Sequence, residues 1–338
     1  MKCPHCPEDD IPEGTKFCPE CGGAMVAPTQ GATTTASAPV DPALRCPNCG
    51  AGPAAIDSDG FCSCGTQRKR PERDHMEVII SPTVAGISDI GKRHNQNEDY
   101  MVLASTKDGD MVLVVCDGVS RSQNQQMGSK VGCEAARDTI LQKLGAGATD
   151  AKEIVTLAIK AGQDAICKVP FDPTKTDQTG AVIDPAQSTI VACLIQSKKV
   201  TIGWAGDSRG YWITPKWVYP LTRDDSWLDE MVNSGKLTME EALKRPEAHA
   251  ITKSLGASDD GKNPGIEPST MGMNVAEPGR LMLCSDGFWN YAEDPAVIRK
   301  LVDSQPANAD ALSLARALVN FANQQGGKDN VTVIFACL

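Results

Sequence analysis

Acidic residues stand beside glycine, and directly after apolar runs, at several points in the second half of this 338-residue sequence. Asp117, for example, follows the run Met111–Cys116. A carboxylate at the end of a buried strand costs free energy unless it is paired or binds a cation. Several carboxylates at one edge repel each other, and a hard divalent cation removes that repulsion. Three of these residues, Asp117, Asp207 and Asp286, follow an apolar run directly, and Asp99 in NQNED and Asp329 in GGKDN complete the set.

Glycines accompany these carboxylates. Gly118 and Gly287 follow Asp117 and Asp286, and they allow close approach of the backbone and offer a carbonyl ligand. Each Asp-Gly or Gly-Asp pair taken singly also fits an ordinary turn. Five such acidic residues together favour a cation site over five independent turns.

Eight of the 14 cysteines lie in the first 64 residues, in two clusters. Two closely spaced cysteine pairs can place four thiolates around one tetrahedral Zn²⁺. Redox Cys-x-x-Cys pairs are the alternative, which the lack of a thioredoxin-like βαβ pattern disfavours. We therefore predict two structural zinc sites. Their ligands are Cys3, Cys6, Cys18 and Cys21 in the first cluster, and Cys46, Cys49, Cys62 and Cys64 in the second.

The residues around the cysteines are poor in large apolar side chains, so zinc replaces a hydrophobic core there. The predicted division is a zinc ribbon over 1–24, a flexible linker over 25–44, a second ribbon over 45–66, a linker over 67–80 and a catalytic domain over 81–338. Zinc ribbons serve in protein docking or in nucleic-acid binding. The net charge of -3 before residue 75, from 7 basic and 10 acidic residues, favours docking to a protein partner.

The elements that must position the carboxylates are visible as apolar patterns. Short apolar runs predict strands, and Thr189–Gln196 with Val200–Ala205 predicts an antiparallel hairpin. The other predicted strands are Val84–Ile90, Tyr100–Ser105, Met111–Cys116, Gly210–Thr214, Arg280–Cys284 and Asn330–Leu338. The predicted helices are Gln125–Leu144, Ala151–Val169, Ser226–Ser234, Thr238–Lys244 and Ala309–Gln324. This order favours antiparallel sheets with helices on their faces.

Charge and hydropathy exclude several classes of protein. The chain has 33 basic and 43 acidic residues, a net charge of -10, which argues against a protein that coats nucleic acid. No apolar run reaches the roughly 18 residues of a membrane-spanning helix. The first residues, MKCPHC, contain no apolar leader. We expect a cytoplasmic protein with no membrane contact and with reduced or metal-bound cysteines.

The second half resembles the metal-dependent Ser/Thr protein phosphatases of the protein phosphatase 2C (PPM) family. The resemblance runs from about Val84 to the C-terminus. The matching strings, in order, are GKRHNQNED, VVCDGVS, QSTIVACLI, GWAGDSRGYW, LTRDDSWLDEMVNSGKLTMEEA, ITKSLGA, RLMLCSDGFWN and GGKDNVTVI. The resemblance implies an α+β fold, a four-layer α/β/β/α sandwich of two antiparallel sheets flanked by helices, preceded here by the two ribbons.

The resemblance also implies a ligand set for two Mn²⁺ or Mg²⁺ ions. Asp117 would bridge the ions and Gly118 would add its carbonyl oxygen. Asp286 and Asp329 would hold one of the ions, and Asp207 with Asp286 resembles a weaker third metal site.

Glu98 and Asp99 would act mostly through metal-bound water. Two cations lower the pKa of a bridging water and neutralise the phosphoryl oxygens. Hydrolysis would then be direct, without a phosphoenzyme.

The sequence departs from the family pattern at the phosphate-binding position. Family members usually place Arg four residues before the Glu of their NED motif, and His94 stands there in this chain, after Arg93. Imidazole lacks the bidentate fork of a guanidinium. We expect Arg93 or Arg121 to supply the positive charge, or His94 to bind phosphate more weakly. After Asp117-Gly118 the chain has VSRS, without the histidine that some members have as a general acid.

The predicted function is therefore hydrolysis of phosphoserine and phosphothreonine in phosphorylated protein substrates by a monomeric catalytic domain, while the ribbons dock partners or substrates. The alternative is a zinc-ribbon adaptor whose phosphatase-like domain is catalytically weak or inactive. The presence of the metal-ligand carboxylates favours the enzyme.

Overall fold

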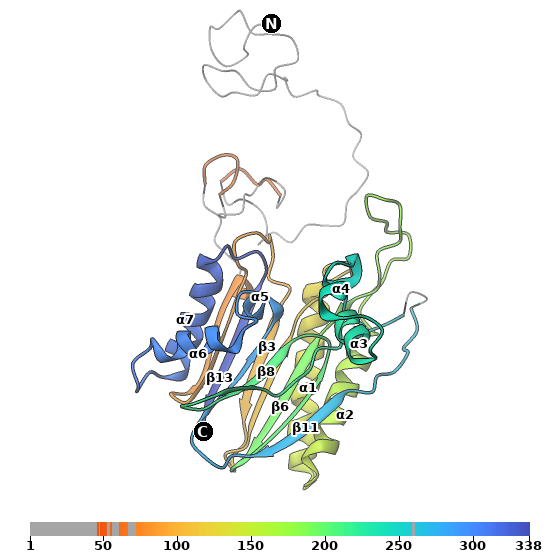
Figure 1. The fold of residues 1–338 in the computed structure, drawn as a ribbon. Coiled ribbons are helices and arrows are strands. Elements are labelled where there is room, and N and C mark those ends of the chain that lie inside the picture. Colours follow the sequence, from red (N-terminus) through yellow and green to blue (C-terminus); the bar gives the residue numbers. More distant parts are fainter. Residues whose placement is uncertain (1–45, 47, 53–54, 56–60, 67–71, 259–260) are drawn as a thin grey trace, which may run out of the picture. The chain divides into compact units, whose positions relative to one another are not determined.

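Two antiparallel sheets stack face to face in this computed structural model (Figure 1). The structure describes residues 46, 48–52, 55, 61–66, 72–258 and 261–338, all within one compact unit over residues 43–338. The predicted first zinc ribbon (1–24) and the predicted linker over 25–44 lie outside the described residues.

The first sheet has six strands in the order β1-β2-β13-β12-β8-β9. Its strands are β1 (His75–Ser81), β2 (Val84–Asp89), β8 (Arg209–Ile213), β9 (Val218–Pro220), β12 (Arg280–Cys284) and β13 (Val331–Cys337). The second sheet has five strands in the order β11-β7-β6-β4-β3. Its strands are β3 (Tyr100–Ser105), β4 (Met111–Cys116), β6 (Ile190–Gln196), β7 (Lys199–Ala205) and β11 (Ser269–Asn274). A short pair, β5 (Gln187–Ser188) and β10 (Leu255–Gly256), stands apart.

Helices cover the outer face of each sheet, so the molecule has four layers (Figure 1). Helices α1 (Gln125–Gly145) and α2 (Ala151–Ile166) pack on the five-stranded sheet. Helices α6 (Pro295–Asp303) and α7 (Ala311–Gln324) cover the other sheet, beside the short α5 (Asp286–Trp289). Helices α3 (Trp227–Asn233) and α4 (Met239–Leu243), with the 3₁₀ turn Pro246–His249, form an insertion between β9 and β10. The predicted α+β four-layer sandwich is confirmed.

Three apolar clusters hold the layers together. One lies between the two sheets and includes Leu113, Ile202 and Ile334. The other two lie between each sheet and its helices. The central strands are buried on both faces, which explains why they are continuous apolar runs in the sequence rather than alternating ones.

The strand β1 corrects the predicted linker over residues 67–80. His75–Ser81 pairs antiparallel with β2 at the edge of the six-stranded sheet, so the sheet begins within that range. In β1 the half-buried Met76 and Val78 alternate with the exposed Glu77 and Ile79. This alternation is typical of an edge strand with one solvated face. The predicted hairpin of β6 and β7 is confirmed, with Ser197 in the turn at φ 52°.

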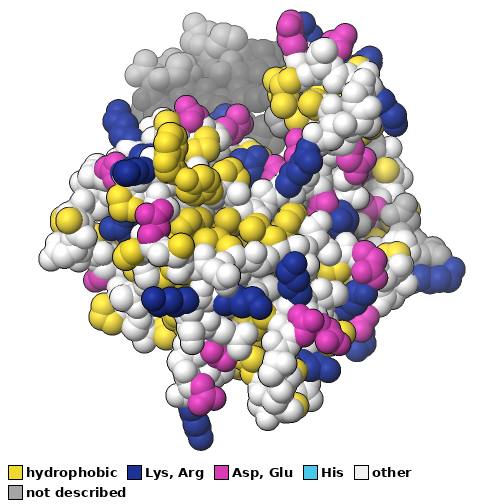
Figure 2. Space-filling model, turned by 60° about the horizontal axis from the view of Figure 1, so that its bottom comes forward, with side chains coloured by type: hydrophobic (Ala, Val, Ile, Leu, Met, Phe, Trp, Pro, Cys, Tyr) yellow, Lys and Arg dark blue, Asp and Glu magenta, His cyan; other side chains and the backbone are white. Residues whose placement is uncertain are grey.

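The surface of the described residues mixes charges of both signs. On the face shown in Figure 2, Lys and Arg side chains are interspersed with Asp and Glu side chains around a band of hydrophobic ones. That face therefore carries no continuous basic surface. Within the described part of the chain, no helix is long and apolar enough to cross a membrane.

Candidate active site at the junction of the two sheets

The five predicted aspartates come from both sheets. Asp117 directly follows β4 of the five-stranded sheet, and Asp207 stands two residues after the end of β7 in the same sheet. Asp286 begins α5 just after β12, and Asp329 stands two residues before β13, in the six-stranded sheet. Asp99 ends the loop that crosses from one sheet to the other, between β2 and β3. The site is thus assembled only where the two sheets meet.

The electrostatics show that these carboxyls lie together. Burial raises the pKa of Asp117 well above its usual value, and the charges of Asp99, Asp286, Asp329 and Asp207 raise it further. A carboxyl whose pKa is raised by the charges of four other carboxyls lies at the centre of an acidic cluster. The structure therefore brings together all five aspartates that the sequence singled out.

The neighbouring carboxyls are perturbed in the same direction. Burial raises the pKa of Asp207 to about 7, with a further rise from Asp286. Burial and the charge of Asp329 likewise raise the pKa of Asp286 to about 7. Without a cation, the cluster therefore holds protons near neutral pH, because its charges repel each other in a poorly solvated site.

Asp99 is held by two hydroxyl groups. Ser285 Oγ and Thr332 Oγ1 each donate a hydrogen bond of 2.7 Å to Asp99 Oδ2. The pKa of Asp99 is nevertheless raised to about 7, with burial as the largest cause. Its other oxygen, Oδ1, is buried and has no hydrogen-bond partner among the described residues. A buried carboxylate oxygen that has no hydrogen-bond partner and lies in an acidic cluster fits the role of a cation ligand.

Glu98 lies on the same loop, and Asn330 helps to fix it. The Glu98 amide donates to Asn330 Oδ1 at 2.7 Å, while Asn330 Nδ2 donates to the Ile90 carbonyl at 2.8 Å. The Glu98 side chain is buried and accepts a hydrogen bond of 3.0 Å from Gln96. Asn330 is in the KDN string of the sequence, but its role as a loop anchor was missed.

The glycines beside the aspartates permit close backbone packing. A Cβ atom on Gly287 would lie 1.8 Å from the Asn330 carbonyl oxygen. On Gly118 it would lie 2.8 Å from Gln125 Cβ and 3.1 Å from the Glu98 carbonyl oxygen. Both positions therefore require glycine, as expected from the sequence.

The three predicted phosphate-binding residues lie in different surroundings. His94 Nε2 is 3.2 Å from Asp329 Oδ1, so the structure brings His94 to the cluster. Arg93 is exposed on the same loop. The Arg121 side chain is 83% exposed, and its Nη2 lies 4.0 Å from Asp177 Oδ2.

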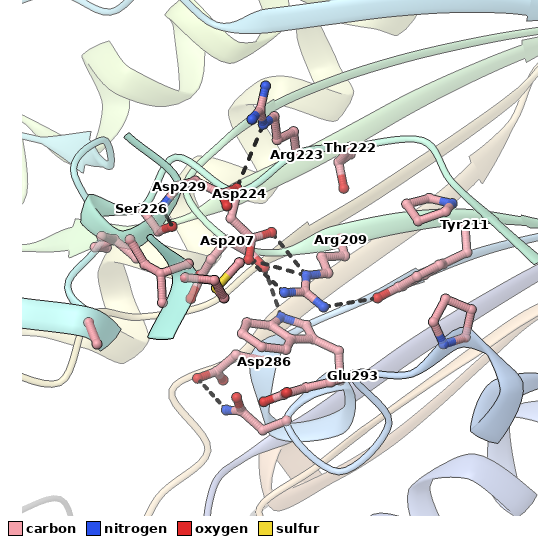
Figure 3. A pocket seen from close by; sticks show the side chains of 18 of the residues that line it. Asp207, Arg209, Tyr211, Thr222, Arg223, Asp224, Ser226, Asp229, Asp286 and Glu293 are labelled. Atoms are coloured by element: carbon pink, nitrogen blue, oxygen red, sulfur yellow. Dashed lines mark hydrogen bonds and ion pairs between the residues drawn. The ribbon is translucent and has the colours of Figure 1, made fainter. Parts of the chain in front are cut away.

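A cavity of about 680 Å³ opens beside Asp207 and Asp286 (Figure 3). Arg209 crosses it, paired with Asp224 at 2.7 Å and stacked 3.5 Å from the Trp289 ring. Trp289 Nε1 in turn donates to the Asp207 carbonyl at 2.8 Å. Apolar side chains of α3, α4 and the following segment line another wall: Leu228, Met239, Leu243 and Ile251. This cavity depends on tertiary packing, so local sequence patterns do not predict it.

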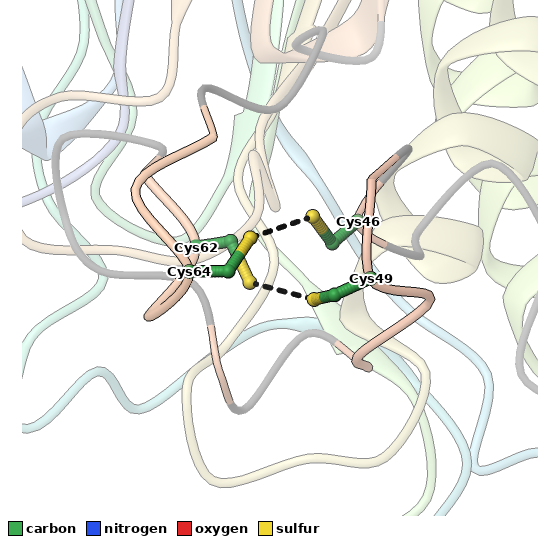
Figure 4. Close-up of side chains that lie close together, drawn as sticks. All are labelled: Cys46, Cys49, Cys62 and Cys64. Carbon is green, nitrogen blue, oxygen red and sulfur yellow. Dashed lines mark hydrogen bonds between the residues drawn. The ribbon is translucent and has the colours of Figure 1, made fainter.

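The second cysteine cluster forms a separate site (Figure 4). The Sγ atoms of Cys46, Cys49, Cys62 and Cys64 all lie within 4.8 Å of one another. The Cys46–Cys64 and Cys49–Cys62 sulfur distances are 3.6 and 3.5 Å. A hydrogen bond with Thr66 lowers the pKa of Cys64 to about 6, which favours its thiolate.

Each cysteine pair sits on a tight turn that ends in glycine. The Gly50 amide donates to the Cys46 carbonyl at 2.9 Å, and the Gly65 amide donates to the Cys62 carbonyl at 2.7 Å. Gly50 and Gly65 have φ values of 70° and 80°, which other residues rarely adopt. These turns orient the thiols of each cysteine pair toward the thiols of the other pair.

The fold and the acidic cluster together define a four-layer sandwich hydrolase that works with divalent cations. The family model for protein phosphatase 2C matches residues 90–328, and the chain belongs to this family. It is therefore a metal-dependent protein phosphatase, and phosphatases of this type use Mn²⁺ or Mg²⁺.

Individual relatives agree with the family match. The chain is 26% identical over 248 residues to the serine/threonine phosphatase stp of Listeria welshimeri, covering 73% of this chain and 92% of the relative. It is similar to the structure of serine/threonine phosphatase Stp1 from Staphylococcus aureus, with a TM-score of 0.61 and 25% identity over 78% of this chain and 98% of that one. The fold is also that of the PstP catalytic domain solved with two manganese ions (TM-score 0.54, 24% identity, 75% and 97% coverage).

Proposed function

We propose that this phosphatase hydrolyses phosphoserine and phosphothreonine in protein substrates at the aspartate cluster. The convergence of Asp99, Asp117, Asp207, Asp286 and Asp329 carries the proposal. Relatives named as serine/threonine phosphatases support the substrate class.

The described residues fit hard divalent cations. Their donor set consists of carboxylate oxygens, which Mn²⁺ and Mg²⁺ prefer. The raised pKa of Asp117 and the orphaned Oδ1 of Asp99 are both relieved when cations enter the cluster. The manganese ions in the PstP structure support the same ligand class.

The proposed ligand roles are those that the resemblance to the family implies. Asp117 would serve both ions, the Gly118 carbonyl would be a further ligand, and Asp286 and Asp329 would hold one of the ions. Asp207 with Asp286 would form the weaker third site. Glu98 and Asp99 would act mostly through metal-bound water. When bound, such ions acidify a water molecule and neutralise phosphoryl charge.

The chain's own residues orient this set. Ser285 and Thr332 hold Asp99, Asn330 holds the backbone of Glu98, and His94 holds Asp329. For the substrate phosphate, the positive charge would come from Arg93, His94 or Arg121. Preorganisation of this kind accounts for much of the catalysis of phosphoryl transfer.

The cavity beside Asp207 and Asp286 offers room for the peptide around the phosphorylated residue. Its apolar wall from α3 and α4 would contact side chains that flank the phosphate. The cavity adjoins the aspartates, so a peptide lying there would present its phosphate to them (Figure 3).

The cysteine cluster is proposed to bind structural Zn²⁺. Four sulfurs within 4.8 Å of one another fit one tetrahedral ion. We propose a second, similar site at Cys3, Cys6, Cys18 and Cys21, and docking of partners or substrates by both ribbons. The proposed chain organisation is thus two ribbons, their linkers and a catalytic domain.

The decisive experiment measures phosphate release from a phosphothreonine peptide by the full chain with Mn²⁺. The wild type should turn over only with added Mn²⁺ or Mg²⁺, and Asp117→Ala should lose at least about 10³-fold in kcat because an entire metal bridge is removed. Asp138→Ala is the matched control, since Asp138 is exposed on α1 and pairs with the neighbouring Arg137. An inactive wild type that still binds phosphopeptide would favour the adaptor alternative.

A further inference from the structure

Arg73 connects the segment before β1 to the loop of the proposed active site. It lies in the short 3₁₀ turn Glu72–Asp74. Its Nε donates to the Asn97 carbonyl at 2.8 Å, and its Nη2 donates to the Asp99 carbonyl at 3.2 Å. One side chain thus holds the loop on both sides of Glu98.

The carbonyl of Glu98 itself is held through Ser129. Arg73 Nη2 donates to Ser129 Oγ at 2.8 Å, and Ser129 Oγ donates to the Glu98 carbonyl. Three successive carbonyls, at residues 97, 98 and 99, therefore depend directly or through one hydroxyl on a single guanidinium.

The contact is reciprocal. Asn97 Nδ2 donates to the Arg73 carbonyl at 2.9 Å and to Ser88 Oγ at 2.9 Å. The guanidinium also lies 4.8 Å from the centre of the Tyr100 ring, the residue after Asp99. The backbone and side chain of Arg73 are thus both tied to residues 97–100.

Only arginine suits this arrangement. Its planar fork presents several N–H donors in fixed directions, whereas lysine offers a point charge. Hydrogen bonds from a charged donor are stronger than neutral ones, and the acceptors here are otherwise neutral carbonyl and hydroxyl oxygens. A lysine at this position would keep the charge and lose the simultaneous contacts.

We propose that Arg73 is a positioning residue of the phosphatase, which sets the backbone of Asn97–Asp99 and so the placement of Glu98 and Asp99. The inference rests on the proposed function, because those two carboxylates act only if the cluster binds cations. Arg73 follows Thr66, the last described residue of the cysteine cluster, by seven positions. The segment that leaves the proposed zinc ribbon thereby becomes part of the active-site framework.

The test compares Arg73→Lys and Arg73→Ala with wild type in the full chain. We expect both variants to lose about tenfold or more in kcat and in Mn²⁺ affinity, with the peptide KM within about twofold. Mn²⁺ affinity is measured by calorimetry, and amide hydrogen exchange of the peptide covering Asn95–Met101 should accelerate even without Mn²⁺. A role confined to global stability would be rescued by Lys and would leave this exchange unchanged below the melting temperature.

Arg316→Ala is the matched control. Arg316 forms a bidentate pair with Glu77, at 2.7 and 2.8 Å, so it ties β1, the strand that follows Arg73, to α7. It should retain wild-type kcat, Mn²⁺ affinity and loop exchange. The inference is overturned if both Arg73 variants show wild-type kcat, Mn²⁺ affinity and loop exchange in an assay in which Asp117→Ala is inactive. An inactive wild-type protein would instead contradict the proposed function. Hydrogen exchange of the loop would then still show whether Arg73 holds residues 97–99.

Discussion

His94 Nε2 lies 3.2 Å from Oδ1 of Asp329, so the imidazole rests against a carboxylate of the acidic cluster. The sequence comparison placed His94 where family members usually have a phosphate-binding arginine. In the structure its contact is with a proposed metal ligand. His94 is thus placed to orient Asp329, as residues behind metal ligands commonly do.

Replacement of His94 should weaken metal binding. In His94→Ala we expect Mn²⁺ affinity to fall about tenfold or more, because Asp329 loses its orienting partner. The dependence of activity on Mn²⁺ concentration measures this, and kcat at saturating Mn²⁺ should change much less. His75→Ala, which removes the contacts of His75 with Asp89 and Glu77, is the control. An unchanged Mn²⁺ dependence in His94→Ala would contradict the assigned role.

The arginines Arg93 and Arg121 should contribute to the binding of the substrate rather than to the binding of the metal ions. Arg93→Ala or Arg121→Ala should raise the phosphopeptide KM several-fold, since an exposed charge contributes about 1 kcal/mol or less to a contact in water. The measurement is steady-state kinetics at saturating Mn²⁺. If both variants keep wild-type KM and kcat, phosphate binding does not depend on these guanidinium groups.

The cation-free protein should lose stability as pH rises. Asp99, Asp207 and Asp286 have folded-state pKa values of about 7, above the roughly 3.9 of an unfolded aspartate. Between about pH 4 and 7 the folded state therefore binds more protons than the unfolded state. For each extra proton that the folded state binds, the free energy of unfolding falls by up to about 1.4 kcal/mol for every unit by which the pH rises.

Thermal melts from pH 5 to 7.5 test this, with and without Mn²⁺ and with zinc content checked. Cations replace the protons, so the gap between the two melting temperatures should widen with pH. Asp207→Asn should flatten the cation-free slope by about one proton. A cation-free protein that gains stability over this range would refute the prediction.

Gly287 should not tolerate alanine. Its added Cβ would meet the Asn330 carbonyl oxygen at 1.8 Å and push apart the segments that carry Asp286 and Asp329. We expect a loss of about 1–3 kcal/mol or more in unfolding free energy, together with weaker Mn²⁺ binding. Denaturant titration measures the first effect. Gly145→Ala is the control, since no atom lies within 4 Å of its added Cβ, and it should be neutral or stabilising.

The zinc content of the protein should depend on the four clustered cysteines. Cys64→Ser should lower the zinc content of the purified chain by about one ion, because three thiolates and a hydroxyl bind Zn²⁺ poorly. Elemental analysis counts the metal. Cys167→Ser, outside the cluster, should keep the wild-type content. Equal zinc content in both variants would show that the cluster does not hold the ion.

Much of the fold was predictable from the sequence, because the central strands are buried on both sides. The central strands Met111–Cys116 and Arg280–Cys284 match the predicted bounds, and so does the edge strand Tyr100–Ser105. The apolar runs also placed the aspartates at strand ends, which is why the cluster was foreseen. The missed strand β11 (Ser269–Asn274) is only partly buried, and its sequence STMGMN contains no run of branched apolar residues.

Contacts between distant segments could not be predicted. Arg73 meets Asn97 and Ser129 across the fold, and Asn330 meets Glu98 over 232 positions of sequence. Local patterns say nothing about such pairs, because side-chain donors and acceptors become neighbours only after the sheets stack. The pairing of His94 with Asp329 belongs to the same class, because it joins two segments that are far apart in the sequence.

The position of β13 has a consequence for the rigidity of the site. The strand lies inside its sheet and pairs on one side with β2 and on the other with β12. The segment that carries Asp329 is therefore anchored at its C-terminal end by two rows of backbone hydrogen bonds. The amides of Val331–Cys337 should be among the slowest to exchange with solvent, because they open only when the sheet itself opens.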